Sequence, residues 1–122
     1  MLSLAPKTRI YAYTQPVDMR KGFNGLCGIV RGQLKADPTD GSLFLFLNRR
    51  RDRIKILHFD DGGFWLYYRL LEAGTFEKLT SNNDSATLQM DAAELTMLLS
   101  GVSLEAAGKR RKRFTPPGAS TS

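Results

Sequence analysis

The residues with the most distinctive chemistry are the cations of residues 49–55, which read RRRDRIK. This segment holds five basic side chains and a single acid, Asp52. Guanidinium groups bind phosphate and the edge of guanine through paired N–H donors, and clustered cations are typical of proteins that contact a polyanion. The alternative is that some of the arginines pair with Asp52, Asp60 or Asp61 on the same surface. We predict that the segment contacts nucleic acid, mainly at phosphates, through Arg49, Arg50, Arg51, Arg53 and Lys55.

Two further groups of cations extend this prediction. Residues 109–113 read KRRKR, and basic tails of this kind bind polyanions through salt-sensitive counterion release. The basic pair at 20–21 would lie in the first turn of a predicted helix, where positive charge opposes the helix dipole, which suggests that the pair faces a partner. Both groups have the simpler alternative of being solvated surface cations. The predicted nucleic-acid-binding set therefore also includes Arg20, Lys21, Lys109, Arg110, Arg111, Lys112 and Arg113.

The sequence offers little for catalysis. The single histidine, His58, precedes Asp60 and Asp61, but this spacing matches no established metal-binding pattern. The single cysteine, Cys27, lies on the apolar face of a predicted helix, where a cysteine is usually an inert small hydrophobe. We therefore predict no catalytic residue, no metal and no cofactor, and hence no enzyme. The most distant alternative is a small metal-dependent nuclease that uses Asp60, Asp61 and His58.

The composition favours one folded domain in a reducing compartment. The chain has 122 residues, of which 42% are apolar, enough for a core of its own. The net charge is +6, and because the two basic runs supply more than this, the rest of the chain is mildly acidic. One cysteine cannot form an internal disulfide, and neither a secretory signal nor a membrane span is evident. We expect a cytoplasmic protein with no membrane partner.

The elements that would position the cations begin with a strand and a helix. Residues 9–14 alternate in polarity and predict a strand. Asp18 is expected to cap a helix that stops before Asp37. Four glycines interrupt this helix, and we interpret them as sites of tight packing on the sheet. The helix is predicted from one apolar face formed by Met19, Phe23, Leu26, Cys27, Val30 and Leu34.

Three consecutive strands follow, at 43–48, 53–59 and 64–71. The first is apolar at every position except its last residue, which predicts a central strand covered on both sides. The segment 49–52 lies between the first two strands, so its arginines should form the tip of a hairpin. The sequence DDGG at 60–63 predicts a second tight turn.

The remainder predicts a short strand, a helix and a tail. Residues 86–90 suit an edge strand, and Asp91 with Glu94 resembles a capping box at the start of a helix that ends at Gly101. From about residue 106 the chain has too few apolar residues to pack, which predicts a flexible basic tail after a single domain at 1–105. The fold class is therefore α+β, a small antiparallel sheet covered by two helices on one face.

Three segments in this order resemble a known family: DMRKGFNGL at 18–26, LFLFLNRRRDRIKIL at 43–57 and GFWLYYRLLEAGTF at 63–76. Together they are similar to the second-open-reading-frame accessory protein (TnpB-type, not the RNA-guided nuclease of that name) of insertion-sequence family sixty-six. The resemblance covers about residues 9–103. It implies a small bacterial protein encoded beside a separate, larger transposase to which catalysis is assigned. The motif residues Asp18 to Phe23 and Arg49 to Arg53 carry over as signature positions only.

Residues and resemblance together favour a non-catalytic accessory protein of transposition that binds DNA, at element ends or non-specifically, through the basic hairpin and the tail. The alternative is a protein-interaction module that docks on the transposase, because arginine and aromatic residues are equally enriched at protein interfaces. An exposed aromatic surface of Trp65, Tyr67 and Tyr68 would then make the contact.

Overall fold

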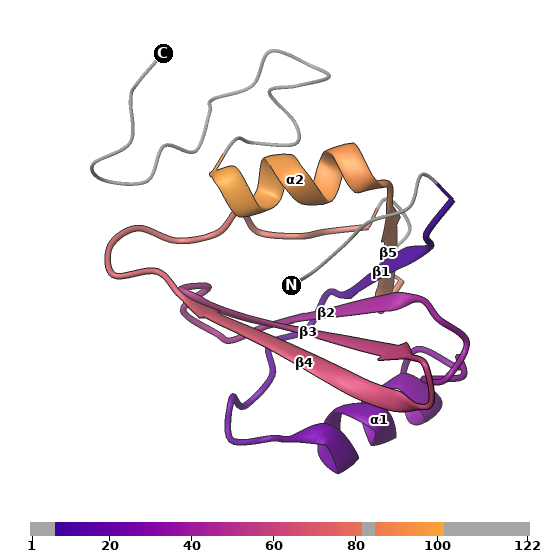
Figure 1. Cartoon of the computed structure of the whole chain (residues 1–122). Coiled ribbons are helices and arrows are strands. Elements are labelled where there is room, and N and C mark those ends of the chain that lie inside the picture. Colours follow the sequence, from indigo (N-terminus) through magenta and orange to yellow (C-terminus); the bar gives the residue numbers. More distant parts are fainter. Residues whose placement is uncertain (1–6, 82–84, 102–122) are drawn as a thin grey trace.

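One five-stranded sheet organises the computed structural model, which describes residues 7–81 and 85–101 (Figure 1). The strands are β1 (Ile10–Tyr13), β2 (Leu43–Leu47), β3 (Arg53–Asp60), β4 (Gly63–Leu70) and β5 (Thr87–Met90). The helices are α1 (Phe23–Gly32), between β1 and β2, and α2 (Ala92–Ser100), after β5. The strands lie in the order β4-β3-β2-β1-β5 across the sheet. The α+β class is confirmed, and β5 lies at an edge as predicted.

The sheet is mixed and not purely antiparallel. Strands β2, β3 and β4 form the predicted antiparallel meander, and β5 pairs antiparallel with β1. Strand β1 instead runs parallel to β2, with Ile10 opposite Leu43. A parallel pair needs a long crossover, and α1 supplies it. The β1–α1–β2 unit therefore makes the one parallel pairing of this sheet.

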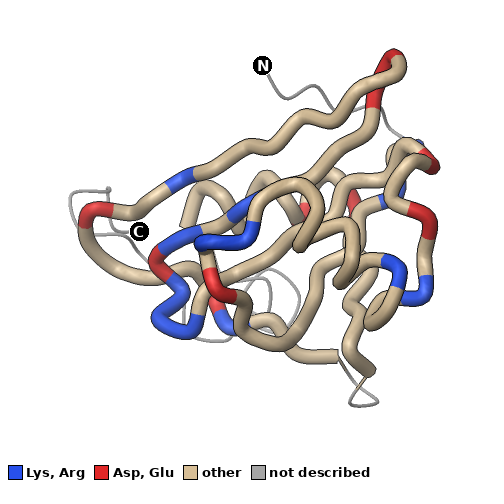
Figure 2. The backbone as a smooth tube through the Cα atoms, turned by 90° about the horizontal axis from the view of Figure 1, so that it is seen from below, with Lys and Arg blue, Asp and Glu red and all other residues tan. Residues whose placement is uncertain are grey.

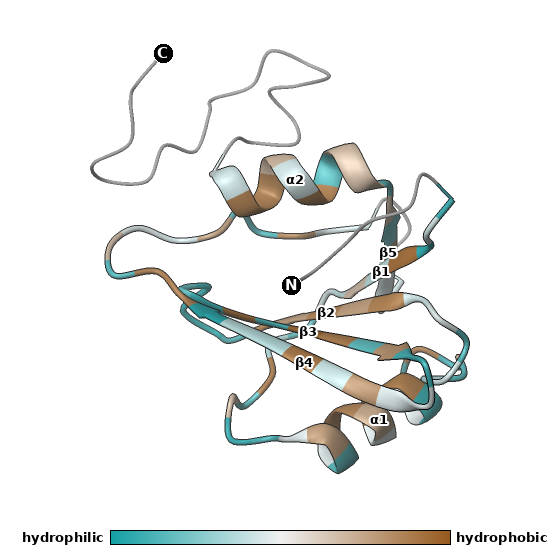
Figure 3. Cartoon of the chain, viewed as in Figure 1, coloured by the Kyte–Doolittle hydropathy of each residue, from teal (hydrophilic) through white to brown (hydrophobic). Residues whose placement is uncertain are grey.

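The prediction that both helices cover one face is wrong, because α1 and α2 lie on opposite faces (Figure 1). On one face, Leu43, Leu45 and Leu47 of β2 join a core that includes Leu95 and Leu98 of α2. On the other face, Phe44 and Phe46 pack with residues of α1. All five residues of β2 are buried, which agrees with the prediction of a doubly covered central strand. Figure 3 shows apolar residues along β2, β3 and both helices.

Helix α1 begins later than predicted, at Phe23, and Gly22 rather than Asp18 occupies its N-cap position. Residues 18–21 form a turn instead, in which the Lys21 amide donates to the Asp18 carbonyl at 3.1 Å. The prediction that the helix glycines pack tightly on the sheet is also wrong. The atoms nearest an added Cβ at Gly25 belong to the Lys21 side chain, at 3.2 Å, and not to the sheet. A Cβ atom added at Gly22, Gly28 or Gly32 would meet no atom within 4 Å. These glycines lie on the open side of the helix.

Helix α2 has the predicted ends. The Asp91 carboxylate accepts from the Glu94 amide at 2.8 Å, and the Glu94 carboxylate accepts from the Asp91 amide at 2.9 Å. Gly101 takes the left-handed conformation, φ 87°, that closes the helix. Within residues 7–81 and 85–101 no helix is long and apolar enough to cross a membrane. The predicted tail at 106–122 lies outside the described residues.

The capping box gives a direct test of this helix end. Asp91→Ala removes the acceptor for the Glu94 amide, so the free energy of unfolding should fall by about 1 kcal/mol. Thr96→Ala is the matched control, because Thr96 is exposed on the same helix and its hydroxyl only donates to the Ala92 carbonyl. Urea denaturation followed by circular dichroism measures both. Equal stability of the two variants would contradict the assignment.

Candidate nucleic-acid interface

The turn between β2 and β3 is built by Asn48. Its backbone carbonyl accepts from the Arg51 amide at 3.1 Å, and its side-chain oxygen accepts from the amides of Asp52 and Arg53 at 3.1 and 3.0 Å. Its side-chain amide donates to the Asp52 carboxylate at 2.7 Å. One residue therefore accepts hydrogen bonds from three backbone amides of this tight turn. The basic segment is therefore held at one end of the sheet, where Figure 2 shows its cations gathered.

Arg49 and Arg50 are the two cations of this turn that remain available. Both are exposed, and neither makes a hydrogen bond or an ion pair with another described residue. Arg20 and Asp18, outside this turn, form an ion pair with a closest N–O distance of 2.6 Å. Neither Arg49 nor Arg50 forms an ion pair with a described acid, and the charge of Arg50 acts on the Asp52 carboxyl only at longer range.

The three acids considered as partners form no ion pair with the arginines of this turn. Asp60 ends β3 and Asp61 lies in the β3–β4 turn, at the opposite end of β3 from the arginines. Asp52 faces inward to Asn48. The hydrogen bond from Asn48 lowers the pKa of the Asp52 carboxyl, and the charges of Arg50 and Arg53 lower it further. Asp52 thus supports the turn as a carboxylate without forming an ion pair with an arginine.

Two other arginines of the segment have structural contacts as well. Arg51 takes a left-handed backbone conformation, φ 59°, and its carbonyl accepts from the Phe76 amide at 2.6 Å. Its guanidinium donates to the Phe76 carbonyl at 3.2 Å. Arg53 donates to the Tyr68 hydroxyl at 3.0 Å. Each guanidinium has five N–H donors, so both arginines retain donors for a ligand.

Lys55 does not belong to the exposed basic ridge, and its predicted place there is wrong. Its side chain is only 6% exposed. The ammonium donates to the carbonyls of Met19 and Lys21, both at 2.7 Å, and lies 4.7 Å from the centre of the Tyr68 ring. The cause is the alternation of β3, which turns Lys55 to the face that the loop before α1 covers.

That loop brings the predicted basic pair to the same end of the molecule. Asp18 and Met19 line a hollow of about 460 Å³ together with Arg49, Arg50 and Arg53. The Arg20 guanidinium forms a paired contact with the Asp18 carboxylate, at 2.6 Å for the closest atoms, and its side chain is 91% exposed. Its charge is therefore partly compensated, whereas Lys21 is exposed.

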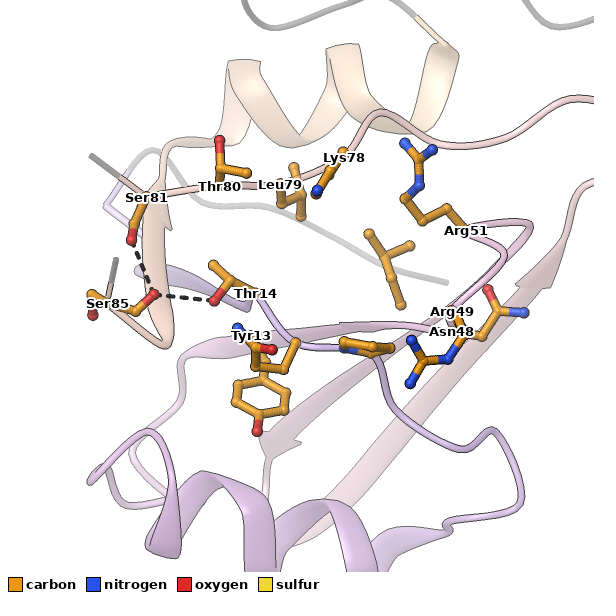
Figure 4. A pocket seen from close by; sticks show the side chains of 13 residues that line it. Tyr13, Thr14, Asn48, Arg49, Arg51, Lys78, Leu79, Thr80, Ser81 and Ser85 are labelled. Atoms are coloured by element: carbon orange, nitrogen blue, oxygen red, sulfur yellow. Dashed lines mark hydrogen bonds between the residues drawn. The ribbon is translucent and has the colours of Figure 1, made fainter. Parts of the chain in front are cut away.

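The second hollow of this region contains a residue that sequence reasoning missed. It measures about 590 Å³ and is lined by Arg49 and Arg51 of the turn and by Lys78 of the segment after β4 (Figure 4). A lone lysine in an irregular segment has no spacing pattern, so nothing in the sequence pointed to it. The basic residues at 109–113 lie outside the described residues.

The described residues show no arrangement for metal catalysis. Among residues 7–81 and 85–101 no three His, Cys, Asp or Glu side chains gather closely enough to hold a metal ion. The Nδ1 atom of His58 lies 3.5 Å from the Ser42 carbonyl. Cys27 is buried, and burial raises the pKa of its thiol, which disfavours the reactive thiolate.

Comparison with known proteins identifies the family. The family described as IS66 Orf2 like protein matches residues 8–109. The chain belongs to this IS66 Orf2-like family. It is thereby an accessory protein of insertion-sequence transposition.

Two proteins of Sinorhizobium fredii are similar to this IS66 Orf2-like protein. The uncharacterized protein y4jC is 37% identical over 94 residues, which are 77% of this chain and 79% of the relative. The uncharacterized protein y4hO is 32% identical over 102 residues, 84% of this chain and 87% of the relative. No solved structure matches the chain significantly.

The signature segments of this IS66 Orf2-like protein meet in space. Lys55, from the second segment, holds the backbone of residues 19–21 in the first segment, and its ammonium faces Tyr68 of the third.

Lys55→Met keeps the buried stem but leaves two carbonyls unpaired, so the free energy of unfolding should fall by about 2 kcal/mol. Chemical denaturation measures the change. Lys21→Met, at an exposed position, should change it by less than about 0.5 kcal/mol, and an unaltered Lys55→Met protein would refute the role.

The Asp18–Arg20 contact predicts an unusual acid. The hydrogen bonds from Arg20 lower the pKa of Asp18 from 3.8 to about 2. Because the pKa is lowered on folding, the contribution of this pair to stability is present above pH 4 and is lost as the pH falls through about 2. In an NMR titration of the carboxyl carbons, Arg20→Gln should raise the Asp18 midpoint toward 3.8.

The matched control for this titration is Asp37. Its pKa is lowered by hydrogen bonds from the Thr39 backbone and side chain, so its midpoint should not respond to Arg20→Gln. An Asp18 midpoint that is the same in both proteins would contradict the assignment.

Proposed function

We propose that this IS66 Orf2-like protein is a non-catalytic accessory that binds DNA through the β2–β3 turn and supports a separate transposase of the same element. The observation that carries the proposal is the pair Arg49 and Arg50, two exposed guanidinium groups without an acid partner among the described residues, on a turn fixed by Asn48. A rigid turn holds the two charges close together before a ligand arrives. Less conformational freedom is then lost when phosphates bind.

The arrangement suits contact with the DNA backbone. Guanidinium groups bind phosphate through paired donors, and backbone contacts position a protein without specifying sequence. A two-stranded ribbon such as β2–β3 has the width to enter a major groove, which would allow base contacts as well. The predicted basic residues 109–113 would add a sequence-independent attraction. We accordingly expect strong salt dependence and modest sequence preference.

Non-catalytic action is supported by two separate points. The described residues hold no cluster of metal ligands, and burial raises the pKa of the Cys27 thiol, which disfavours a nucleophilic thiolate. The resemblance assigns catalysis to the larger transposase. Positioning or bridging of DNA is then the contribution that a small basic partner can make.

The test is fluorescence anisotropy with a labelled duplex, over a salt series. Arg49→Glu/Arg50→Glu should weaken binding by at least roughly tenfold and reduce the salt slope by about 2, one for each lost phosphate contact. The matched control is Arg9→Glu/Arg31→Glu, with the same change of charge at exposed positions. Arg9 precedes Ile10, which pairs with the start of β2, so it lies at the other end of that strand from the turn.

The outcomes separate the hypotheses. Equal weakening by the two double variants would show that net charge and not the turn determines binding. A duplex with the terminal inverted repeat of an element and a scrambled duplex, measured side by side, give the specificity ratio. Absence of binding to either duplex at low salt would refute the proposal.

A second function, docking on the transposase, is favoured by one observation. Trp65 is 53% exposed and stacks on Tyr67 with ring centres 6.4 Å apart, on the face of the sheet that carries α2. Exposed tryptophan is enriched at the centres of protein interfaces. If this surface docks, Trp65→Ser should abolish co-purification of the transposase from nuclease-treated, high-salt lysate. Phe23→Ser is the control, because Phe23 is an aromatic residue that is 45% exposed and packs on Phe64 on the α1 side.

A further inference from the structure

The larger hollow lies between two parts of the chain that are distant in sequence. Residues 13–16 and the β2–β3 turn form one wall, and residues 78–81 with Ser85 form the other. Three basic side chains line it, Arg49 and Arg51 from the turn and Lys78 from the opposite wall (Figure 4). No Asp or Glu is among its described lining residues. Three cations among the described lining residues favour an anionic ligand.

The walls of this hollow are fixed by hydrogen bonds. The hydroxyls of Thr14 and Ser81 both donate to the Ser85 carbonyl, at 3.0 and 2.9 Å. Arg51 is held by the backbone and side-chain contacts with Phe76 described above. The hydroxyl protons of Thr14 and Ser81 are therefore already used. The donors left for a ligand are mainly those of Arg49, Arg51 and Lys78.

The size of the hollow limits which form of nucleic acid can enter it. A volume of about 590 Å³ is that of an ordinary small-ligand site. A rigid duplex, whose major groove alone is about 12 Å wide, cannot enter it. An unpaired strand is narrow and flexible, and such strands are bound in positively charged grooves that follow their backbone.

The floor of the hollow offers no stacking surface for bases. The Tyr13 ring is turned away from the three cations, toward α1, and packs against Phe46 with ring centres 6.4 Å apart (Figure 4). Base stacking is the usual source of base preference in single-strand binding. Contact here would be made with phosphates, independently of sequence.

We propose that this hollow binds the phosphates of an unpaired nucleic-acid strand, such as a single-stranded DNA end. The inference rests on the proposed DNA binding and deepens it. Arg50 contacts duplex DNA from outside the hollow, Lys78 contacts the unpaired strand inside it, and Arg49 lines both hollows of this region. The protein thus distinguishes a DNA end with an overhang from continuous duplex.

The proposal is tested with the full chain and two labelled probes. One probe is a blunt duplex, and the other is the same duplex with a single-stranded overhang. The overhang should tighten binding, and Lys78→Glu should remove that gain, roughly tenfold, while leaving the blunt duplex unaffected. Lys7→Glu is the matched control, since Lys7 is an exposed lysine outside the hollow. Circular dichroism establishes that both variants are folded.

The results distinguish this inference from the proposed function. If the chain binds neither probe, both fail. If Arg49→Glu/Arg50→Glu weakens blunt-duplex binding but the overhang adds nothing, or if Lys78→Glu affects both probes equally, only the role of the hollow is overturned. A free nucleoside monophosphate should compete poorly. If this monophosphate, at the same phosphate concentration as the overhang, abolishes the tighter binding that the overhang gives, an unpaired strand is not the ligand.

Discussion

The position of the loop before α1 depends on the contacts of the buried Lys55 ammonium. A buried cation must be compensated, and here two backbone carbonyls and one aromatic ring share the task. The carbonyls belong to residues 19 and 21, so the charge holds the loop before α1 against the third strand of the sheet. This contact determines where α1 can begin. It also places Asp18 and Met19 beside the arginine turn.

The β2–β3 turn and the start of β3 contain cations that stabilise the fold as well as cations that remain available to a ligand. The five basic residues of 49–55 look equivalent in composition, yet they have three different environments. Lys55 is buried, Arg51 and Arg53 each donate to a neighbour, and Arg49 and Arg50 project freely. The partly engaged residues stiffen the turn that presents the free ones. Charge that has been positioned in this way contributes more to phosphate binding than the same charge on a flexible loop.

Sequence patterns predicted the parts of the fold that are governed by local rules. The meander of β2, β3 and β4, the turn at 60–63 and both ends of α2 follow from alternation, turn residues and capping chemistry. The placement of α1 did not follow, because Asp18 turns to Arg20 and Lys55 controls the loop from 34 residues away in sequence. The candidate site also contains residues that local sequence patterns predict and one that they do not. Arg49 and Arg50 were predictable, whereas Lys78 joins them only through tertiary packing.

The parallel pairing of β1 with β2 has a consequence for how the chain folds. Strand β1 has neighbours that are synthesised later on both sides, and its partner β5 is among the last described elements, with Ile10 opposite Met90. The meander has only short connections and can form early, whereas the pairing of β1 with β5 must wait until residues 87–90 have been made. Contacts of such long sequence separation slow folding. Until α2 emerges, one side of the nascent sheet stays uncovered, so a chain shortened at that end would expose leucines that the complete protein buries.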